Sequence, residues 1–472
     1  MQVTEEQLSV IVNRVIEKLH EHQSPYCSSA GNKLSGEKNP YIFDSIDEAI
    51  TSAKKAFENL GKRTLKERQG YIYALRDTFK KHITELAVEM ENETGLGRAE
   101  DKVKKLSLVI EKTPGTEDVQ PQVFTGDDGI TLVEHAPFGV IGAITPVTNP
   151  VETIVCNSIG FIAGGNTAVF NPHPNSKNVC AHAVYLINEA VVSSGGPPNL
   201  IATIWEPTVE SAQELMNHRE VRLLVVTGGG GVVKAAMQSG KRVIAAGPGN
   251  PPVVVDETAD IPKAARDIAL GASMDNNIIC VLEKEIIAVD SIVEQLKTEM
   301  KKHKTLELST RQIERLEKIL VHDHAPNKEF TGKNAAILLE QIDVRSKEDI
   351  RLLLAEVDEK HPFVQLEMMM PLIGLVRVKN VEEAIAAAIR CEHGFHHTAA
   401  MHSRNIDNLS NMAKRINTTI FVKNASSLAG LGYGGEGYTS FTIAGPTGEG
   451  LTTARTFTRE RRCTLKDYFR IV

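Results

Sequence analysis

Cys280 is the residue of this chain whose position best suits covalent chemistry. It follows a polar, turn-forming run, Ser273 to Asn277, and precedes an apolar, β-prone run, Ile286 to Val289. A thiol exposed where a strand begins could act as a nucleophile and hold an acyl group as a thioester, which a second acceptor can remove. The alternative is a buried and inert cysteine, the commoner state of a lone thiol.

Asn149 is the second candidate for this chemistry. The segment Pro137 to Pro150 is typical of a buried strand that enters a rigid Thr-Pro-Val-Thr-Asn-Pro corner. Such a corner can hold an amide side chain in one orientation, and a fixed amide N–H₂ is a suitable donor to an oxyanion.

A glycine turn follows another apolar strand. Val225 to Lys234 predicts a strand, a turn at Thr227, Gly228 and Gly229, and then a helix. Backbone N–H groups at the start of such a helix can bind phosphate. Because the GxGxxG pattern is missing, a tight strand–helix turn without a ligand is an equal alternative.

Other reactive side chains have structural explanations as well. His396 and His397 could help to remove a proton from an incoming thiol, since histidine titrates near neutrality, or could simply satisfy local hydrogen bonds. Cys156, Cys180 and Cys391 lie in helix-like apolar surroundings and are predicted to be structural.

The elements that must position these residues alternate along the chain. Helical periodicity covers 46–60, 65–90 and 102–111, and β-prone segments lie at 139–144, 167–170, 223–226 and 242–245. This alternation indicates βαβ units and a parallel, doubly wound sheet, with a second alternating region from 252 to about 422. The tail after 426 is rich in Gly and Thr and ends in an expected strand at 451–458.

The N-terminal segment has a pattern of its own. Apolar residues between Leu8 and Leu19 form one stripe of a helix over 4–19, and the polar stretch 20–40 indicates a flexible linker. A tethered helix cannot bury its stripe within itself. It could dock on its own domain, on another subunit, or on a separate partner such as a shell or scaffold.

Composition excludes several functions. With 53 basic and 60 acidic residues the net charge is -7, which gives no support to nucleic-acid binding. No apolar run approaches the ~20 residues that span a membrane, and the N-terminus does not resemble a secretory signal. Six scattered cysteines without ligand spacing predict no metal, no disulfide framework and a reducing cytoplasm.

Taken in order, these motifs resemble the aldehyde dehydrogenase superfamily from about residue 41 onward. There, a segment like 137–146 (Pro-x-Gly-Val-x-Gly-x-Ile-x-Pro) lies beside the cofactor and the catalytic cysteine, and a turn like 227–229 binds cofactor phosphate. Glu367, four residues before Pro371, resembles the glutamate that contacts the nicotinamide ribose, and Cys280 falls where the nucleophile is expected.

Three departures narrow the resemblance to the CoA-acylating branch. Ala245 stands where hydrolytic members carry a water-activating glutamate, and alanine cannot act as a base. Asn171 replaces the lysine near the adenosine ribose, and Thr-Asn-Pro replaces Trp-Asn-Phe-Pro. The runs 275–277 and 443–450 resemble propionaldehyde and acetaldehyde dehydrogenases of bacterial microcompartments, in which an N-terminal helix and linker act as an encapsulation tag.

The resemblance implies an α/β, aldehyde dehydrogenase-like fold. It comprises a Rossmann-type NAD-binding domain, an α/β catalytic domain and a small β oligomerisation element that would make a homodimer or homotetramer. The expected parts are an encapsulation helix at 1–19, a linker at 20–40, the NAD domain at 41–115 and 135–247, the catalytic domain at 248–425, and the oligomerisation element at 116–134 and 426–472.

The implied activity is NAD-dependent oxidation of a short aldehyde, propionaldehyde first and acetaldehyde second, with transfer of the acyl group to coenzyme A. It would take place in the cytoplasm within a microcompartment whose shell protein binds residues 4–19. Cys280 and Asn149 would be catalytic. The expected cofactor-binding residues are Thr145, Pro146, Asn171, Pro172, His173, Thr227, Gly228, Gly229, Gly247 and Glu367. The alternatives are a hydrolytic aldehyde dehydrogenase and a catalytically silent shell-cargo or scaffold protein.

Overall fold

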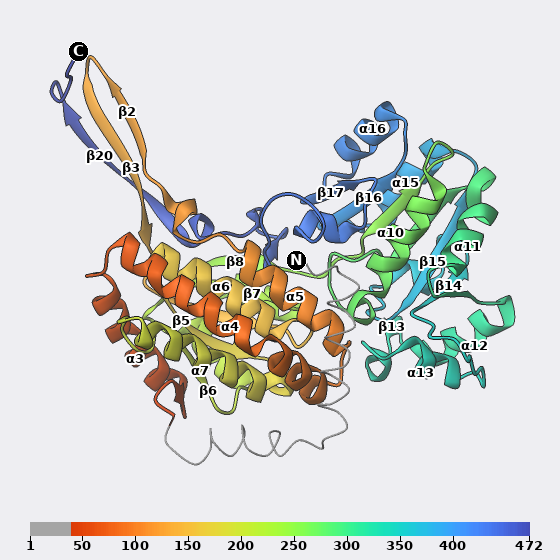
Figure 1. The fold of residues 1–472 in the computed structure, drawn as a ribbon, viewed down its shortest axis with the longest axis horizontal. Coiled ribbons are helices and arrows are strands. Elements are labelled where there is room, and N and C mark those ends of the chain that lie inside the picture. Colours follow the sequence, from red (N-terminus) through yellow and green to blue (C-terminus); the bar gives the residue numbers. More distant parts are fainter. Residues whose placement is uncertain (1–38) are drawn as a thin grey trace, which may run out of the picture. The chain divides into compact units, whose positions relative to one another are not determined.

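The computed structural model describes residues 39–472, which form two compact units (Figure 1). The first unit holds the described chain up to Glu93, with Val103–Ala246 and Tyr438–Val472. The second holds Thr94–Lys102 and Gly247–Gly437. The expected helix at 4–19 and almost all of the linker at 20–40 lie outside the described residues.

A six-stranded parallel sheet organises the first unit, in the order β1-β6-β5-β4-β7-β8. Its strands are β1 (Ile42–Phe43), β4 (Val140–Thr145), β5 (Thr167–Pro172), β6 (Ile201–Ile204), β7 (Val221–Thr227) and β8 (Arg242–Ala246). The helices are α3 (Ile46–Leu60), α4 (Leu65–Thr94), α5 (Ala99–Lys112), α6 (Pro150–Gly164), α7 (Lys177–Ser193), α8 (Val209–Asn217) and α9 (Gly230–Met237). The first turn of α5, up to Lys102, belongs to the second unit. The doubly wound sheet predicted from the alternation is confirmed.

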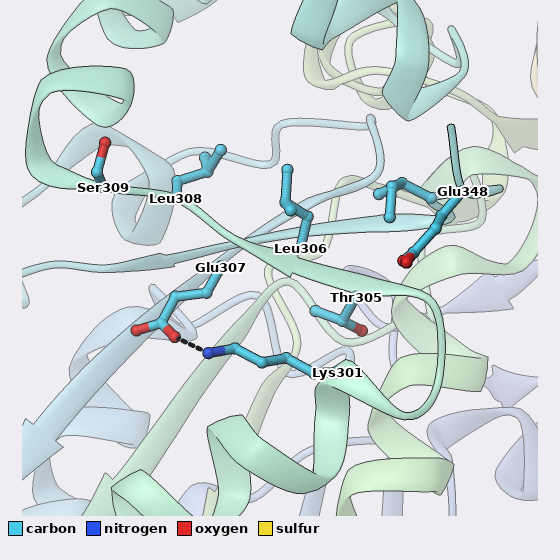
Figure 2. A pocket seen from close by; sticks show the side chains of 8 residues that line it. Lys301, Thr305, Leu306, Glu307, Leu308, Ser309 and Glu348 are labelled. Atoms are coloured by element: carbon cyan, nitrogen blue, oxygen red, sulfur yellow. Dashed lines mark ion pairs between the residues drawn. The ribbon is translucent and has the colours of Figure 1, made fainter. Parts of the chain in front are cut away.

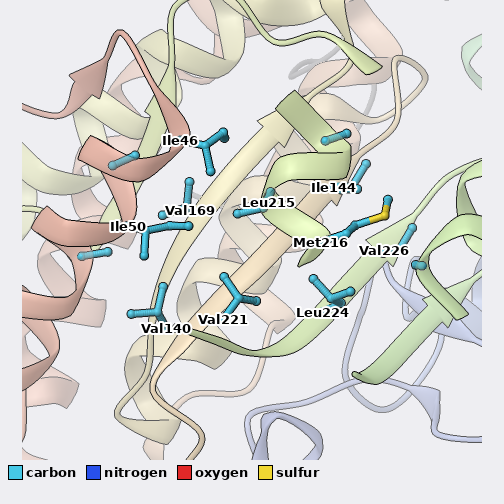
Figure 3. Packing of buried hydrophobic residues seen from close by; sticks show 14 of the residues in the cluster. Ile46, Ile50, Val140, Ile144, Val169, Leu215, Met216, Val221, Leu224 and Val226 are labelled. Atoms are coloured by element: carbon cyan, nitrogen blue, oxygen red, sulfur yellow. The ribbon is translucent and has the colours of Figure 1, made fainter. Parts of the chain in front are cut away.

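Both faces of this sheet are covered. On one face, Ile46 and Ile50 of α3 and Leu215 of α8 pack with strand residues such as Val169 and Leu224 (Figure 3). Phe170 points to the opposite face because side chains alternate along a strand, and there it meets Phe161 of α6. The loops that follow the strands are therefore held on a scaffold that is buried on both sides.

Helix α3 begins and ends where its sequence predicts. The Ser45 side chain accepts a hydrogen bond from the Glu48 N–H (3.3 Å), and Asp47 and Glu48 favour the positive end of the helix dipole. The helix buries a stripe of apolar residues at helical spacing: Ile46, Ala49, Ile50, Ala53, Ala56 and Leu60.

The second unit contains a seven-stranded parallel sheet, in the order β11-β14-β15-β10-β9-β16-β17. Its strands are β9 (Pro252–Val255), β10 (Glu285–Val289), β11 (Thr305–Glu307), β14 (Leu352–Glu356), β15 (Leu372–Val378), β16 (Thr398–His402) and β17 (Ile420–Lys423). The helices are α10 (Ile261–Ser273), α11 (Val293–Lys301), α12 (Thr310–Leu320), α13 (Ala335–Glu340), α14 (Pro362–Gln365), α15 (Val381–Cys391) and α16 (Ile406–Ile416). Short strand pairs complete the fold: β12 (Val321–His322) with β13 (Ala325–Pro326), and, in the first unit, β18 (Ile443–Ala444) with β19 (Gly450–Leu451).

A three-stranded antiparallel sheet also belongs to the first unit. Strand β3 (Gly129–Pro137) pairs with β2 (Gln122–Gly126) on one side and β20 (Thr458–Lys466) on the other. The expected strand at 451–458 is wrong, since only β19 and a 3-10 turn, Arg455–Phe457, occupy that stretch. The strand begins at Thr458, in a charged stretch that shows no hydrophobic pattern because β20 is largely exposed.

Within the described residues, no helix is long and apolar enough to cross a membrane.

Candidate functional site

Cys280 lies in the second unit, in the connection between α10 and β10, and is partly exposed. Within this connection, the three residues Asp275, Asn276 and Asn277 that come before Cys280 all have left-handed backbone conformations, with φ of 46°, 53° and 64°. Asp and Asn tolerate this region better than other residues with a Cβ, which explains the composition of the run. Such a run persists only if surrounding contacts hold it.

Side chains from α5 and the residues before it hold the first part of this run. Lys102 Nζ donates to Asp275 Oδ2 (3.1 Å), and the Arg98 N–H donates to Asp275 Oδ1 (2.7 Å). Arg98 Nε also donates to Asn276 Oδ1 (3.1 Å). Gly97 is required here because a Cβ at this position would lie 1.9 Å from Asp275 Oδ1.

Lys284 holds the end of the run. Its ammonium group donates to Asn277 O (2.8 Å), to Asn277 Oδ1 and to Ile279 O (3.2 Å). The Asn277 amide in turn donates to Ala272 O (2.8 Å) and Glu283 O (3.0 Å). The backbone on the N-terminal side of Cys280 is therefore fixed by buried hydrogen bonds.

The electrostatic surroundings keep the Cys280 thiol protonated. Burial, followed by the negative charge of Glu367, raises the pKa of Cys280 to about 12, while Lys284 acts in the opposite direction. Burial also raises the pKa of Glu367 and lowers that of Lys284. The thiol needs a proton acceptor, or a change in surroundings when substrates bind, to become a nucleophile.

Gly249 brings Glu367, His397 and Cys280 to one place in the second unit. Its N–H donates to Glu367 Oε1 (3.4 Å), and a Cβ on it would lie 2.9 Å from His397 Cγ and 3.1 Å from Cys280 O. A side chain at position 249 would therefore displace its neighbours.

The two adjacent histidines differ in their surroundings. His397 is buried, its Nδ1 pairs with Thr398 Oγ1 (2.8 Å), and burial lowers its pKa to about 4. It is therefore neutral at pH 7 and does not titrate near neutrality, contrary to the reasoning from its residue type. His396 is exposed and pairs with Asn417 O (3.0 Å).

Asn149 lies in the first unit, at the N-cap of α6, but its side chain does not cap the helix. Instead Lys105 Nζ donates to Asn149 Oδ1 (2.8 Å), and Asn149 Nδ2 donates to Thr148 Oγ1 (3.2 Å). Lys105 also forms a buried ion pair with Glu152 (2.8 Å). The orientation of the amide is thus fixed, and one Nδ2 hydrogen is left for another acceptor.

The predicted cofactor residues of the first unit gather at the carboxyl ends of its parallel strands. Thr145 ends β4, Asn171 and Pro172 end β5, and Thr227 ends β7. From β4 the chain continues to β5 and β6 on one side, whereas β7 and β8 lie on the other. In doubly wound sheets a ligand binds at this switch point, which is bordered here by the turns after β4 and β7.

The turn after β7 suits a phosphate group. Gly229 is the N-cap of α9, and no side chain caps this helix. The residues at the start of the helix, Gly229 to Gly231, are exposed. A Cβ at any of these three positions would meet no atom within 4 Å. An anion can therefore approach the backbone N–H groups and the positive end of the helix dipole.

Asn171 and His173 already have partners within the unit. Asn171 Oδ1 accepts from Ser211 Oγ (2.6 Å), beside the N-cap of α8, and its Nδ2 donates to Thr208 O (3.4 Å). The exposed His173 side chain accepts from the Asn175 N–H (3.1 Å). Pro146 and Gly247 follow β4 and β8 directly.

Lys105, Lys284 and Gly249 were not predicted from the sequence. The run Glu283-Lys284-Glu285 has the composition of a solvated surface segment, yet all three residues are buried. The one signal in the sequence is that these three charged residues interrupt an otherwise apolar run, since buried charges of this kind are rare unless they are paired. Cys156, Cys180 and Cys391 are buried on helices, as predicted.

A surface depression of about 510 Å³ lies elsewhere in the second unit, along the edge strand β11 (Figure 2). Lys301 pairs there with Glu307 (2.6 Å), and Glu348 and Ile350 line the same hollow. None of the predicted site residues lines it. Charges of this kind protect an edge strand from pairing with another chain.

The comparisons with known proteins decide the family. The model of the Aldehyde dehydrogenase family matches residues 37–315. The acetaldehyde dehydrogenase (acetylating) EutE of Salmonella typhimurium (strain LT2) is 49% identical over 91% of this chain and 93% of its own length. The chain belongs to the aldehyde dehydrogenase family.

Further members of this aldehyde dehydrogenase family are similarly close. The propanal dehydrogenase (CoA-propanoylating) of the same organism is 45% identical over 91% of this chain and 93% of its own length. The crystal structure of Rhodopseudomonas palustris propionaldehyde dehydrogenase with bound propionyl-CoA has a TM-score of 0.89 and 47% identity, and covers 90% of this chain and 95% of its own. A propionaldehyde dehydrogenase from the Clostridium phytofermentans fucose utilisation bacterial microcompartment has a TM-score of 0.90 and 47% identity, covering 91% and 99%.

Proposed function

We propose that this protein is a CoA-acylating aldehyde dehydrogenase, which oxidises a short aldehyde with a nicotinamide dinucleotide and transfers the acyl group to coenzyme A. Propionaldehyde is the first expected substrate and acetaldehyde the second. This proposal rests on two relatives that are 49% and 45% identical to the chain over 91% of its length. They are named as acylating dehydrogenases for acetaldehyde and propanal. The fixed Cys280 segment supports it.

In the proposed reaction, Cys280 Sγ forms a bond to the aldehyde carbon, and the thiol proton ends on the former carbonyl oxygen. While that oxygen carries charge, the Cys280 N–H and Asn149 Nδ2 donate to it. A nicotinamide dinucleotide would supply the oxidation, because it can take up two electrons and one proton from the adduct while the second proton is released to solvent. Cys280 is then left as a thioester.

Coenzyme A completes the cycle. Its thiol attacks the thioester carbon, the C–S bond to Cys280 breaks, and the proton of the incoming thiol returns to Cys280. The exchange of one thioester for another is nearly neutral in energy, so that excluding water matters more than a strong base. Ala245, buried on β8, presents a methyl group where the hydrolytic enzymes carry a glutamate.

The family resemblance assigns the residues that would hold the dinucleotide. The turn Thr227, Gly228 and Gly229 would bind phosphate at the start of α9. Thr145 and Pro146 border the same switch point, and Glu367 would contact the ribose of the nicotinamide. The roles of Asn171, Pro172, His173 and Gly247 follow from the family resemblance alone.

A CoA-dependence assay tests the function. The protein is incubated with propanal and NAD, with and without CoA, and NADH and propionyl-CoA are measured. We expect sustained NADH formation and stoichiometric acyl-CoA only when CoA is present. Equal rates without CoA, with release of propionate, would identify a hydrolytic enzyme instead. No turnover with either NAD or NADP would favour a silent cargo protein. Cys280→Ala is the control and should abolish both products.

The proposal extends to assembly and location. The apolar pattern of residues 4–19, which predicts a helix, would bind a microcompartment shell protein in the cytoplasm, and the enzyme would form a homodimer or homotetramer. Deleting residues 1–20 should leave turnover unchanged and abolish co-sedimentation with shells. If turnover were lost instead, the segment would belong to the catalytic fold.

A further inference from the structure

Two histidines from distant parts of the sequence meet on the first unit. His82 lies on α4 and His182 on α7, and their ring centroids are 6.3 Å apart at an interplanar angle of 79°. Glu85 and Glu89 follow His82 by three and seven residues on α4, a spacing that places all three on one face of the helix.

Each ring is oriented by a carboxylate. His82 Nδ1 lies 2.8 Å from Glu85 Oε2, and His182 Nδ1 lies 2.7 Å from Glu89 Oε2. For His182, an Nδ1–H held by Glu89 leaves the lone pair of Nε2 free to bind a cation, which is how metal-binding histidines are usually oriented in proteins. His82 Nδ1 and Glu85 Oε2 are close enough to bind the same ion together, with His82 in the tautomer whose Nδ1 carries the lone pair.

The donor atoms are close enough to share one ion. A ligand atom of each of His82, Glu85 and His182 lies within 4.8 Å of a ligand atom of the other two. Around a tetrahedral Zn²⁺ with bonds of about 2.0–2.1 Å the ligand atoms are ~3.3 Å apart. Small rotations close the difference, since the His82 and Glu85 side chains are 34% and 40% exposed and His182 is 12% exposed.

We propose that His82, Glu85 and His182 form a binding site for a divalent transition-metal ion of the zinc class, with Glu89 orienting His182. Two imidazoles and one carboxylate suit Zn²⁺, and a water molecule would complete the tetrahedron. The bound ion would tie α4 to α7. This site is separate from the proposed dehydrogenase reaction. The sequence analysis did not predict it because His182 lies 93 residues after Glu89 in the chain.

The test is zinc titration of metal-free protein in a Cys280→Ala background, which removes the reactive thiol as a competing ligand. Isothermal titration calorimetry should show one zinc per chain, and zinc should raise the melting temperature. His82→Ala and His182→Ala should each weaken binding more than tenfold, and Glu89→Gln about 10–100-fold, as for other groups that orient a ligand. Co²⁺ should give visible absorption bands of a tetrahedral site without thiolate charge transfer.

His218→Ala is the matched control. His218 also pairs with a carboxylate, Asp47 (3.2 Å), but belongs to no group of three potential ligands among the described residues. The His218→Ala variant should bind zinc with the affinity of the parent. Equal zinc affinity in the parent, His82→Gln and His182→Gln variants, or a parent that binds no zinc, would overturn the proposal and leave two ordinary histidine–carboxylate pairs. Circular dichroism of each metal-free variant verifies its fold.

Discussion

Two charges of opposite sign, Glu367 and the buried Lys284, act on the Cys280 thiol. Glu367 raises its pKa and Lys284 lowers it, while burial sets the high starting point. Lys284 also binds the backbone that leads to the thiol, so that the residue which favours the thiolate is the one that positions it. A protonated thiol resists oxidation and is a weaker nucleophile than its thiolate.

The rate of alkylation should report this balance. With a pKa of about 12, the thiolate fraction of Cys280 rises tenfold with each pH unit, so iodoacetamide should modify it about tenfold faster per unit between pH 7 and 10. Lys284→Met removes the opposing positive charge, which raises the thiol pKa further and slows modification at every pH. Mass spectrometry of the Cys280 peptide measures the rate.

Lys301→Met, which removes an exposed lysine of the same unit, is the control for that experiment and should leave the profile unchanged. A Lys284→Met protein that is folded and reacts at the rate of the parent would show that Lys284 does not act on the thiol.

Asn149 should contribute to turnover through its N–H₂ group. Asn149→Ala and Asn149→Asp should both lower kcat by about 10²–10³, the usual effect of losing one oxyanion donor, since aspartate accepts hydrogen bonds but does not donate them. Steady-state kinetics with propanal, NAD and CoA measure this change. Thr148→Val, which removes only a neighbour of the amide, should lose far less. A parental kcat in Asn149→Ala would exclude the role.

At this scale, residue types indicated candidate reactive side chains but not the residues that hold them in place. Cys280 was singled out because a thiol exposed where a strand begins could act as a nucleophile. Lys105 and Lys284 resemble ordinary surface lysines in the sequence, and only the folded structure shows that each is buried against the residue it positions.

Among the elements, the left-handed run before Cys280 is the most constrained. Three consecutive residues with positive φ would each cost about 1–2 kcal/mol for most side chains. Asp275 offsets this through a buried pair with Lys102 in which both side chains are almost completely covered. The turn-forming composition was evident in the sequence, but its partners lie about 175 residues earlier and could not be predicted from spacing.

Breaking this pair should destabilise the second unit strongly. Asp275→Asn or Lys102→Met removes one charge of a buried ion pair, which costs roughly 3–5 kcal/mol. Asp349→Asn removes the exposed pair with Lys304 and should cost less than about 1 kcal/mol. Urea denaturation followed by fluorescence and circular dichroism compares the variants. Equal midpoints for Asp275→Asn and Asp349→Asn would mean that the run does not depend on the pair.

For the whole molecule, the alternation of strands and helices was sufficient to predict two parallel sheets, because each βαβ unit has a local signature. The boundaries of the two units were harder to predict from the sequence. Thr94–Lys102 belongs with the second unit although it lies within the segment assigned to the NAD domain, since long-range contacts rather than composition decide that membership. Strand β20 was missed for a related reason, as its stability comes from pairing with β3.

The antiparallel sheet β2-β3-β20 should govern the oligomeric state. Val123 and Phe124 on β2 and Leu465 on β20 are 55%, 57% and 43% exposed, which is unusual for apolar residues so close together in one small sheet. Phe124→Asp combined with Leu465→Asp should therefore convert a dimer or tetramer into smaller species, as measured by light scattering after gel filtration. Val209→Asp, at an exposed apolar position on α8, is the control and should keep the parental mass. A parental mass in the double variant would show that subunits associate through another surface.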